Sequence, residues 1–72
     1  MHAFSEGQAV KWKWGSGYGH GKVKSTFTKK VTRKIDGKDI TRNGSQEDPA
    51  YYIAGEGTNN VLKLHSELEK DS

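Results

Sequence analysis

The stretch Arg42-Asn43-Gly44-Ser45-Gln46-Glu47-Asp48-Pro49-Ala50-Tyr51-Tyr52-Ile53 joins a polar, acidic loop to an aromatic segment. It contains the only proline of the chain, whose ring fixes φ and removes a backbone donor, so Pro49 suits the entry to a strand. Tyrosine and isoleucine favour strands, and we predict one over residues 51–54. Within the loop, we expect Ser45, Glu47 or Asp48 to hydrogen-bond backbone amides.

Before this stretch, residues 8–14 alternate between apolar and basic side chains. Val10, Trp12 and Trp14 share one face, and Lys11 and Lys13 share the other, which is the period of a half-buried strand. We therefore predict a strand here, with at least one of the two tryptophans in the core.

Residues 15–21 carry a glycine at every second position. Glycine permits positive φ, so we interpret this run as a turn or mobile loop. A second strand is predicted over residues 22–28, with Val23, Ser25 and Phe27 on one face and Lys22, Lys24 and Thr26 facing outward.

Residues 31–42 resemble a hairpin around Asp36-Gly37, a dipeptide that tolerates the positive φ values of a tight turn. A two-residue turn would pair Ile35 with Lys38, whereas a four-residue loop would pair it with Ile40. Both registers place Val31, Ile35 and Ile40 on one face.

After the aromatic segment, residues 55–60 form a predicted loop and residues 61–64 a further strand. Ser66 and Glu69 have the spacing of a capping box, which predicts a short helical turn over residues 65–70. We expect Leu68 to pack back onto the strands.

Together these segments predict an all-β fold: a small five- to six-stranded antiparallel barrel of the SH3-like or OB kind with a short C-terminal helical turn. The 72 residues allow one domain, which we place at residues 6–69, with frayed ends at 1–5 and 70–72. The chain has no cysteine and no apolar run of membrane-spanning length, so we expect a cytoplasmic, non-membrane protein that is a monomer.

Several blocks of residues support a family resemblance, and they cover nearly all of residues 6–69. The most specific is Glu47-Asp48-Pro49-Ala50-Tyr51 with Ile53. The others are Gly7, Val10, Trp12 and Trp14; Gly21-Lys22-Val23; Lys30-Val31-Thr32-Arg33; Ile40-Thr41-Arg42-Asn43; and Val61-Leu62-Lys63 with Ser66-Glu67-Leu68. In these blocks the chain resembles the hypervirulence-associated protein Tudor-domain family, formerly a bacterial and fungal family of unknown function. The resemblance implies an SH3-like, Tudor-type barrel, with no enzymatic activity known for the family and no settled ligand.

The residues themselves argue against catalysis and against a metal site or cofactor. His2, His20 and His65 are the only histidines, and their spacing matches no compact metal-binding pattern. Glu47 and Asp48 are adjacent but lack the alternating ligands of a calcium loop. The glycine-rich run lacks the Gly-Lys-Ser/Thr ending of a phosphate-binding loop. We therefore expect a binding module that is not an enzyme.

Charge is distributed unevenly along the chain. Residues 1–42 hold ten of the twelve basic side chains and three acidic ones, whereas residues 43–72 hold two basic and six acidic side chains. Such asymmetry can steer an acidic partner to one side, or it can reflect strand faces that attract each other within the fold.

Two binding hypotheses follow. In the first, aromatic rings at one mouth of the barrel accept a side chain of a protein or peptide partner, for example a cationic one held over the π faces. The candidate rings are Trp12, Trp14, Tyr18, Tyr51 and Tyr52. Tyr51 and Tyr52 are adjacent and must point to opposite faces of a strand, so we expect one of them to be exposed.

In the second hypothesis, lysines on the outward side of the strands bind the phosphate backbone of a nucleic acid non-specifically, with stacking on Tyr18. The candidates are Lys11, Lys13, Lys22, Lys24, Lys29, Lys30 and Lys34. The acidic final third of the chain would oppose such binding over part of the surface.

Overall fold

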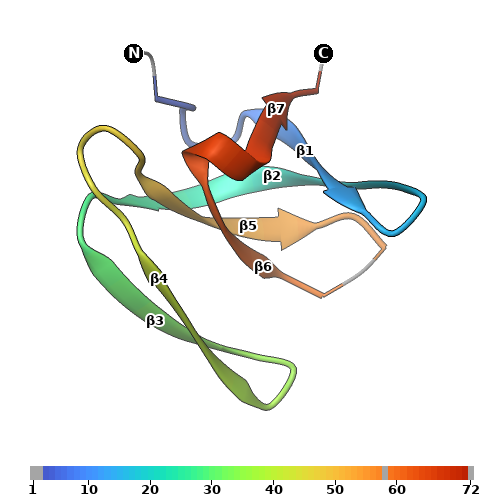
Figure 1. Cartoon of the computed structure of the whole chain (residues 1–72). Coiled ribbons are helices and arrows are strands. Elements are labelled where there is room, and N and C mark those ends of the chain that lie inside the picture. The colour runs from blue at the N-terminus through green and yellow to red at the C-terminus, as the bar shows by residue number, and fades with distance from the viewer. Residues whose placement is uncertain (1–2, 58, 72) are drawn as a thin grey trace.

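The computed structural model describes residues 3–57 and 59–71, and this part of the chain is all-β (Figure 1). Its elements in chain order are β1 (Ala9–Trp14), β2 (Gly17–Phe27), β3 (Lys30–Ile35), β4 (Lys38–Asn43), β5 (Ala50–Gly55), β6 (Val61–Leu64), the 3-10 turn η1 (His65–Glu67) and β7 (Leu68–Lys70). The predicted fold class is confirmed, and the short β7 brings the strands in the described residues to one more than the upper number expected.

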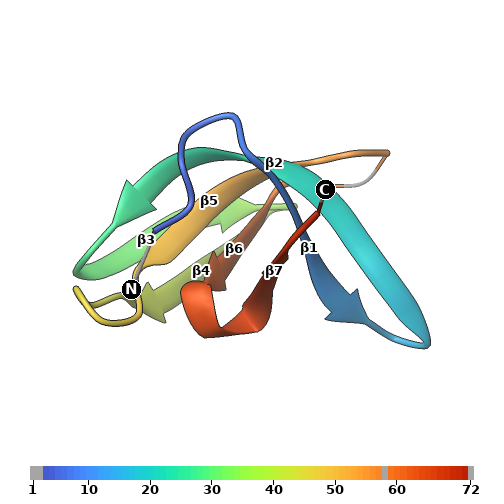
Figure 2. The ribbon, with the colours of Figure 1, turned by 90° about the horizontal axis from the view of Figure 1, so that it is seen from above.

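The strands form two antiparallel sheets. Five of them lie in the order β6-β5-β2-β1-β7, and β3 and β4 form a separate two-stranded sheet. The large sheet is strongly curled (Figure 2), and the β3–β4 hairpin projects away from it (Figure 1). The result is a curled half-barrel, with β4 lying against β6.

The alternating glycines lie mostly within β2, so the interpretation of residues 15–21 as a loop was wrong. Only Gly15 and Ser16 form the turn, and Gly17 pairs with Trp14, Gly19 with Trp12 and Gly21 with Val10. A Cβ on Gly19 would lie 2.5 Å from atoms of the Trp12 indole, and one on Gly21 would meet the backbone of β5. Two of these glycines therefore keep the inner face of a strand clear, and their period of two is the period of the strand itself.

Two apolar clusters cover opposite faces of β5. Tyr51 and Ile53 pack with Val10, Trp12 and Val23 in the first cluster, which Leu68 also joins as predicted. The second cluster contains the buried side chains Val31, Ala50 and Leu62, with Tyr52, Phe27, Ile35, Ile40 and Leu64 packed against it. Because the β3–β4 hairpin covers the outer side of β5, this strand is enclosed on both faces.

The β3–β4 hairpin has the two-residue turn, with Ile35 opposite Lys38. Asp36 and Gly37 both have positive φ, 51° and 76°, as a type I′ turn requires. Val31, Ile35 and Ile40 all contribute to the second cluster, which confirms the face predicted for them.

Two of the three side chains predicted to hydrogen-bond backbone amides in the acidic loop do so, Ser45 and Asp48. Ser45 Oγ accepts a hydrogen bond from the Asp48 N–H, and the Asp48 carboxylate accepts bonds from the N–H and hydroxyl of Ser66 at 2.8 and 3.0 Å. The predicted Ser66–Glu69 capping box was wrong: Glu67 accepts the N–H of Leu64, because the turn ends at Glu67 and Leu68 begins a strand beside β1.

Residues near both ends contact the body of the fold. The Phe4 N–H donates to the Tyr51 hydroxyl, and the Phe4 ring stacks on His65 at 4.7 Å between centroids. Lys70 pairs with Val10 in β7, and the Asp71 N–H donates to Ala9 O. His2 lies outside the described residues. No helix in the part that the structure describes is long and apolar enough to cross a membrane.

Candidate functional site

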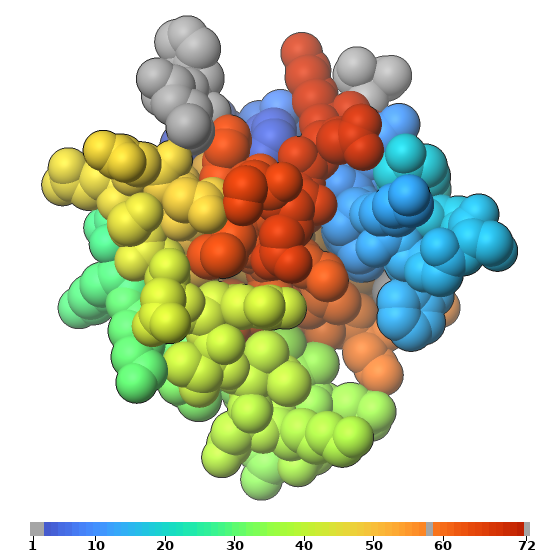
Figure 3. Space-filling model, viewed as in Figure 1, coloured from blue at the N-terminus to red at the C-terminus, as the bar shows by residue number. Residues whose placement is uncertain are grey.

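A hollow of about 410 Å³ lies where three loop regions converge. The β1–β2 hairpin contributes Trp12, Trp14, Tyr18, Gly19 and His20. The tip of β3–β4 contributes Ile35 and Asp36, and the β5–β6 region contributes Glu56, Asn59, Asn60, Val61 and Lys63. Figure 3 shows the β3–β4 tip projecting from the body, with the β1–β2 hairpin standing apart from it. We call this feature the aromatic hollow.

Two indoles form the aromatic wall. Trp12 is only 4% exposed and belongs to the first core cluster, so its ring is held rigidly, whereas Trp14 is 73% exposed. Trp14 lies at the end of β1, beyond the last residue of β1 that pairs with β7, so no strand covers it from that side in the described chain. An exposed indole next to a fixed one offers apolar area and π faces to a ligand.

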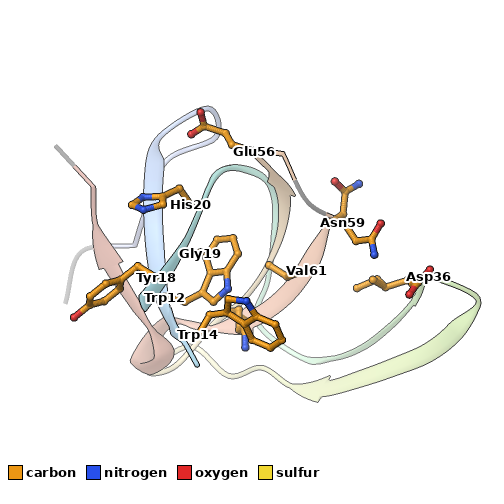
Figure 4. Close-up of a pocket in the computed structure, with 12 residues that line it drawn as sticks. Trp12, Trp14, Tyr18, Gly19, His20, Asp36, Glu56, Asn59 and Val61 are labelled. Carbon is orange, nitrogen blue, oxygen red and sulfur yellow. The ribbon is translucent and has the colours of Figure 1, made fainter. Parts of the chain in front are cut away.

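Carboxylates lie around the rim of the same hollow. Figure 4 shows Glu56 at one margin and Asp36 across the hollow from the two indoles. Lys63 also lines the hollow, so its wall carries charge of both signs, with two carboxylates against one ammonium group. The sequence predicted a turn at Asp36 and a loop at Glu56, but nothing local to either residue indicates that these segments meet the tryptophans.

Tyr18 lies at the margin of the hollow and turns outward. Its ring points away from the two indoles in Figure 4, and the Lys11 ammonium lies 5.0 Å from its ring centroid. Tyr18 pairs with Lys13 across the β1–β2 ladder, so these side chains share the outer face of the sheet.

Tyr51 and Tyr52 do not join the other candidate rings. Tyr51 is fully buried, and Tyr52 is half-buried against the second cluster with its hydroxyl accepting a hydrogen bond from Asn60 Nδ2 at 3.0 Å. They point to opposite faces as predicted, but the expectation that one would be exposed was wrong. The reason is the cover that the β3–β4 hairpin provides on the second face of β5.

The Tyr51 hydroxyl serves the core. It accepts the N–H of Phe4 at 3.0 Å and lies 3.1 Å from His65 Nδ1. Burial is the main cause that raises the pKa of Tyr51, the hydrogen bond from Phe4 opposes the rise, and the negative charge of Asp48 adds to it. The neutral Tyr51 hydroxyl therefore has a structural role, in which it connects Phe4 to His65.

The candidate lysines fall into separate groups. Lys11, Lys13 and Lys22 share the outer face of β1–β2 with Tyr18 and His20. Lys24 lies at an irregularity in the pairing of β2, and Lys29, Lys30 and Lys34 lie in or next to the separate β3–β4 sheet. Among the described residues, His20 Nδ1 lies 2.7 Å from Asp71 Oδ2, and no lysine or arginine lies within 4.0 Å of a carboxylate. The basic side chains are therefore free of close pairs there.

No metal site is found in the described chain. Among residues 3–57 and 59–71, no group of three or more histidine, aspartate or glutamate side chains could hold a metal ion. Chemically, the aromatic hollow offers rings, carboxylates and amides, which suit recognition of a ligand.

Comparison with known proteins assigns the chain to a family. Residues 7–68 match the Tudor domain of the hypervirulence-associated proteins, which is nearly the whole chain. The chain belongs to this family, as the resemblance of its sequence blocks indicated. No curated protein and no solved structure matches it.

Membership defines the protein as a small Tudor-type interaction module. Tudor domains generally mediate interactions with proteins or nucleic acids, and small all-β domains of this type are typically non-catalytic.

Proposed function

We propose that this protein is a non-catalytic module that binds a partner protein by accepting a cationic side chain in the aromatic hollow. The observation that carries the proposal is that one hollow is lined by the Trp12 and Trp14 rings and by the carboxylates of Asp36 and Glu56. A lysine or methylated lysine is attracted to the π face of an indole, and nearby carboxylates strengthen the attraction through charge.

The test is a titration with short peptides that contain unmodified, monomethylated or trimethylated lysine, followed by indole N–H resonances and tryptophan fluorescence. We expect Trp14→Ala to weaken binding of the preferred peptide by about 5- to 30-fold, since about 1–2 kcal/mol is typical of a desolvated cation–π contact. Trp14 is exposed, so this variant should keep its fold, which circular dichroism checks. Peptides that shift neither indole would refute the proposal.

Charge variants test the rim separately. Asp36→Asn keeps a residue that tolerates positive φ while removing the charge, and Glu56→Gln removes the second carboxylate. Both variants should bind the cationic peptide with an affinity several-fold lower than the unchanged protein does. Asp39→Asn is the matched control, because Asp39 lies in the same hairpin but does not line the hollow.

A second candidate function, nucleic-acid binding, is supported by one specific observation. Lys11, Lys13 and Lys22 share an outer face with Tyr18, and no close carboxylate neutralises them within the described residues. Such a face would bind phosphates with an affinity that falls steeply with salt. Retention of a short single-stranded oligonucleotide at low and moderate ionic strength tests it, and absence of retention at low salt eliminates it.

A further inference from the structure

The aromatic hollow is the middle part of a longer groove. A second hollow of about 300 Å³ lies under the β3–β4 tip and shares Ile35, Asp36, Asn59 and Asn60 with it. A third, of about 370 Å³, lies beside the end of β1 and shares Trp12 and Lys63 with it. Because adjacent hollows share walls, the groove is longer than a single side chain requires.

The third hollow lies along an open edge of the large sheet. β7 pairs with β1 only through Val10, Lys11 and Trp12, and Lys13 and Trp14 pair on their other side with β2. No strand of the described chain lies on the β7 side of Lys13 and Trp14. In an antiparallel sheet, alternate residues direct both backbone groups to one side, so one of these two residues directs its N–H and C=O to the open edge.

The charged side chains that line the groove favour a peptide with a basic side chain over a polyanionic strand. Lys13, Lys34 and Lys63 also line the three hollows. Carboxylates outnumber them by four to three: Asp36 lines the first two hollows, Glu56 the aromatic hollow, and Glu67 and Glu69 the third. A polyanionic strand would place phosphates against these groups, whereas a peptide with a basic side chain would not. The open backbone edge offers hydrogen bonds that a peptide backbone can complete.

We propose that the partner binds as an extended peptide segment, with its cationic side chain in the aromatic hollow and its backbone paired with the edge of β1 at Lys13–Trp14. This inference rests on the proposed function and specifies the form of the ligand. The flanking residues of the segment would occupy the hollow beside Ser66–Glu69 on one side and the hollow under the β3–β4 tip on the other.

The experiment compares three probes on the isotopically labelled full chain by NMR titration. They are N-acetyl-trimethyl-lysine methylamide, the capped pentapeptide Thr-Val-trimethyl-Lys-Val-Thr, and the same pentapeptide with its flanking amide nitrogens methylated. We expect the pentapeptide to bind at least 10-fold more tightly than the single residue and to shift the amides of Lys13, Trp14 and 66–69. The pentapeptide with methylated amide nitrogens should bind about 3- to 10-fold more weakly than the unmethylated pentapeptide. Methylation deletes backbone N–H donors while keeping every side chain.

The outcomes separate the two proposals. If the single residue binds as tightly as the pentapeptide and the β1 edge does not shift, the extended mode is wrong and the proposed function stands. If neither probe binds at millimolar concentration, both are wrong. A five-nucleotide oligothymidylate serves as the competing ligand class, and if it shifts the groove amides while the pentapeptide does not, the inferred occupant is overturned.

Discussion

Gly19 lies beneath the Trp12 indole, where an added Cβ would come within 2.5 Å of ring atoms. Trp12 is buried and cannot swing aside, so we expect Gly19→Ala to lower the free energy of unfolding by about 1–3 kcal/mol, as overpacking does. Gly17→Ala is the matched control, because nothing lies within 4 Å of its Cβ and its φ is not positive. Urea unfolding followed by tryptophan fluorescence measures both, and equal stability of the two variants would contradict the packing argument.

Tyr51 connects a buried hydroxyl to the pH dependence of stability. Burial raises its pKa above the ordinary value of 10.0, so the unfolded chain loses this proton at a lower pH than the folded one. The neutral Tyr51 hydroxyl therefore makes its full contribution to the free energy of unfolding below pH 10. That contribution is lost as the pH rises through the pKa of Tyr51 in the folded protein.

We expect the free energy of unfolding to fall above about pH 10, and we expect Tyr51→Phe to remove this component of the fall. The variant should also cost about 1–3 kcal/mol at neutral pH, because the Phe4 N–H loses its acceptor. Urea midpoints from pH 8 to 11 compare the two proteins, and parallel curves would show that another group controls the alkaline decline.

At the scale of elements, Asp48 joins the acidic loop to η1 through two hydrogen bonds to Ser66. Asp48→Ala should lower the free energy of unfolding by about 1–2 kcal/mol, since charged acceptors make the stronger hydrogen bonds and this one is partly exposed. Glu47→Ala is the control, because Glu47 is adjacent to Asp48 but its carboxylate makes none of the side-chain hydrogen bonds found in the described residues. Thermal unfolding would contradict the assignment if Glu47→Ala were the more damaging change.

At the scale of the whole molecule, the two sheets differ in how they are held. β1, β2 and β5 are central or doubly paired within the large sheet, whereas the β3–β4 hairpin shares no ladder with it and depends on side-chain packing. Segments with fewer cooperative contacts open more readily. We expect amide hydrogen exchange to be faster in β3 and β4 than in β2 and β5, as NMR would measure. Equal protection would show that both sheets open as one unit.

The same arrangement matters for binding. The β3–β4 tip carries Asp36 at the rim of the aromatic hollow, so movement of this hairpin would change the width of the groove.

A cytoplasmic location and a monomeric state stay predictions from the sequence.

Local features of the chain were readable because their causes are local. The alternation of Val10, Trp12 and Lys11 defined a half-buried strand, Asp36-Gly37 defined the turn, and Pro49 marked the loop that ends where β5 begins. The family blocks also followed from order along the chain. The alternating glycines misled because a period of two occurs both in a flexible run and in a strand whose inner face must stay clear for the Trp12 ring and the backbone of β5.

The sequence by itself determined the all-β class, most strand positions and the family of this protein. Only the tertiary structure decided which rings are exposed: it buried Tyr51, covered Tyr52 with the β3–β4 hairpin and left Trp14 open. It also brought Asp36 and Glu56 to the tryptophans. The physical reason is that exposure depends on what packs from distant parts of the chain, whereas strand propensity and turn geometry depend on neighbours in sequence.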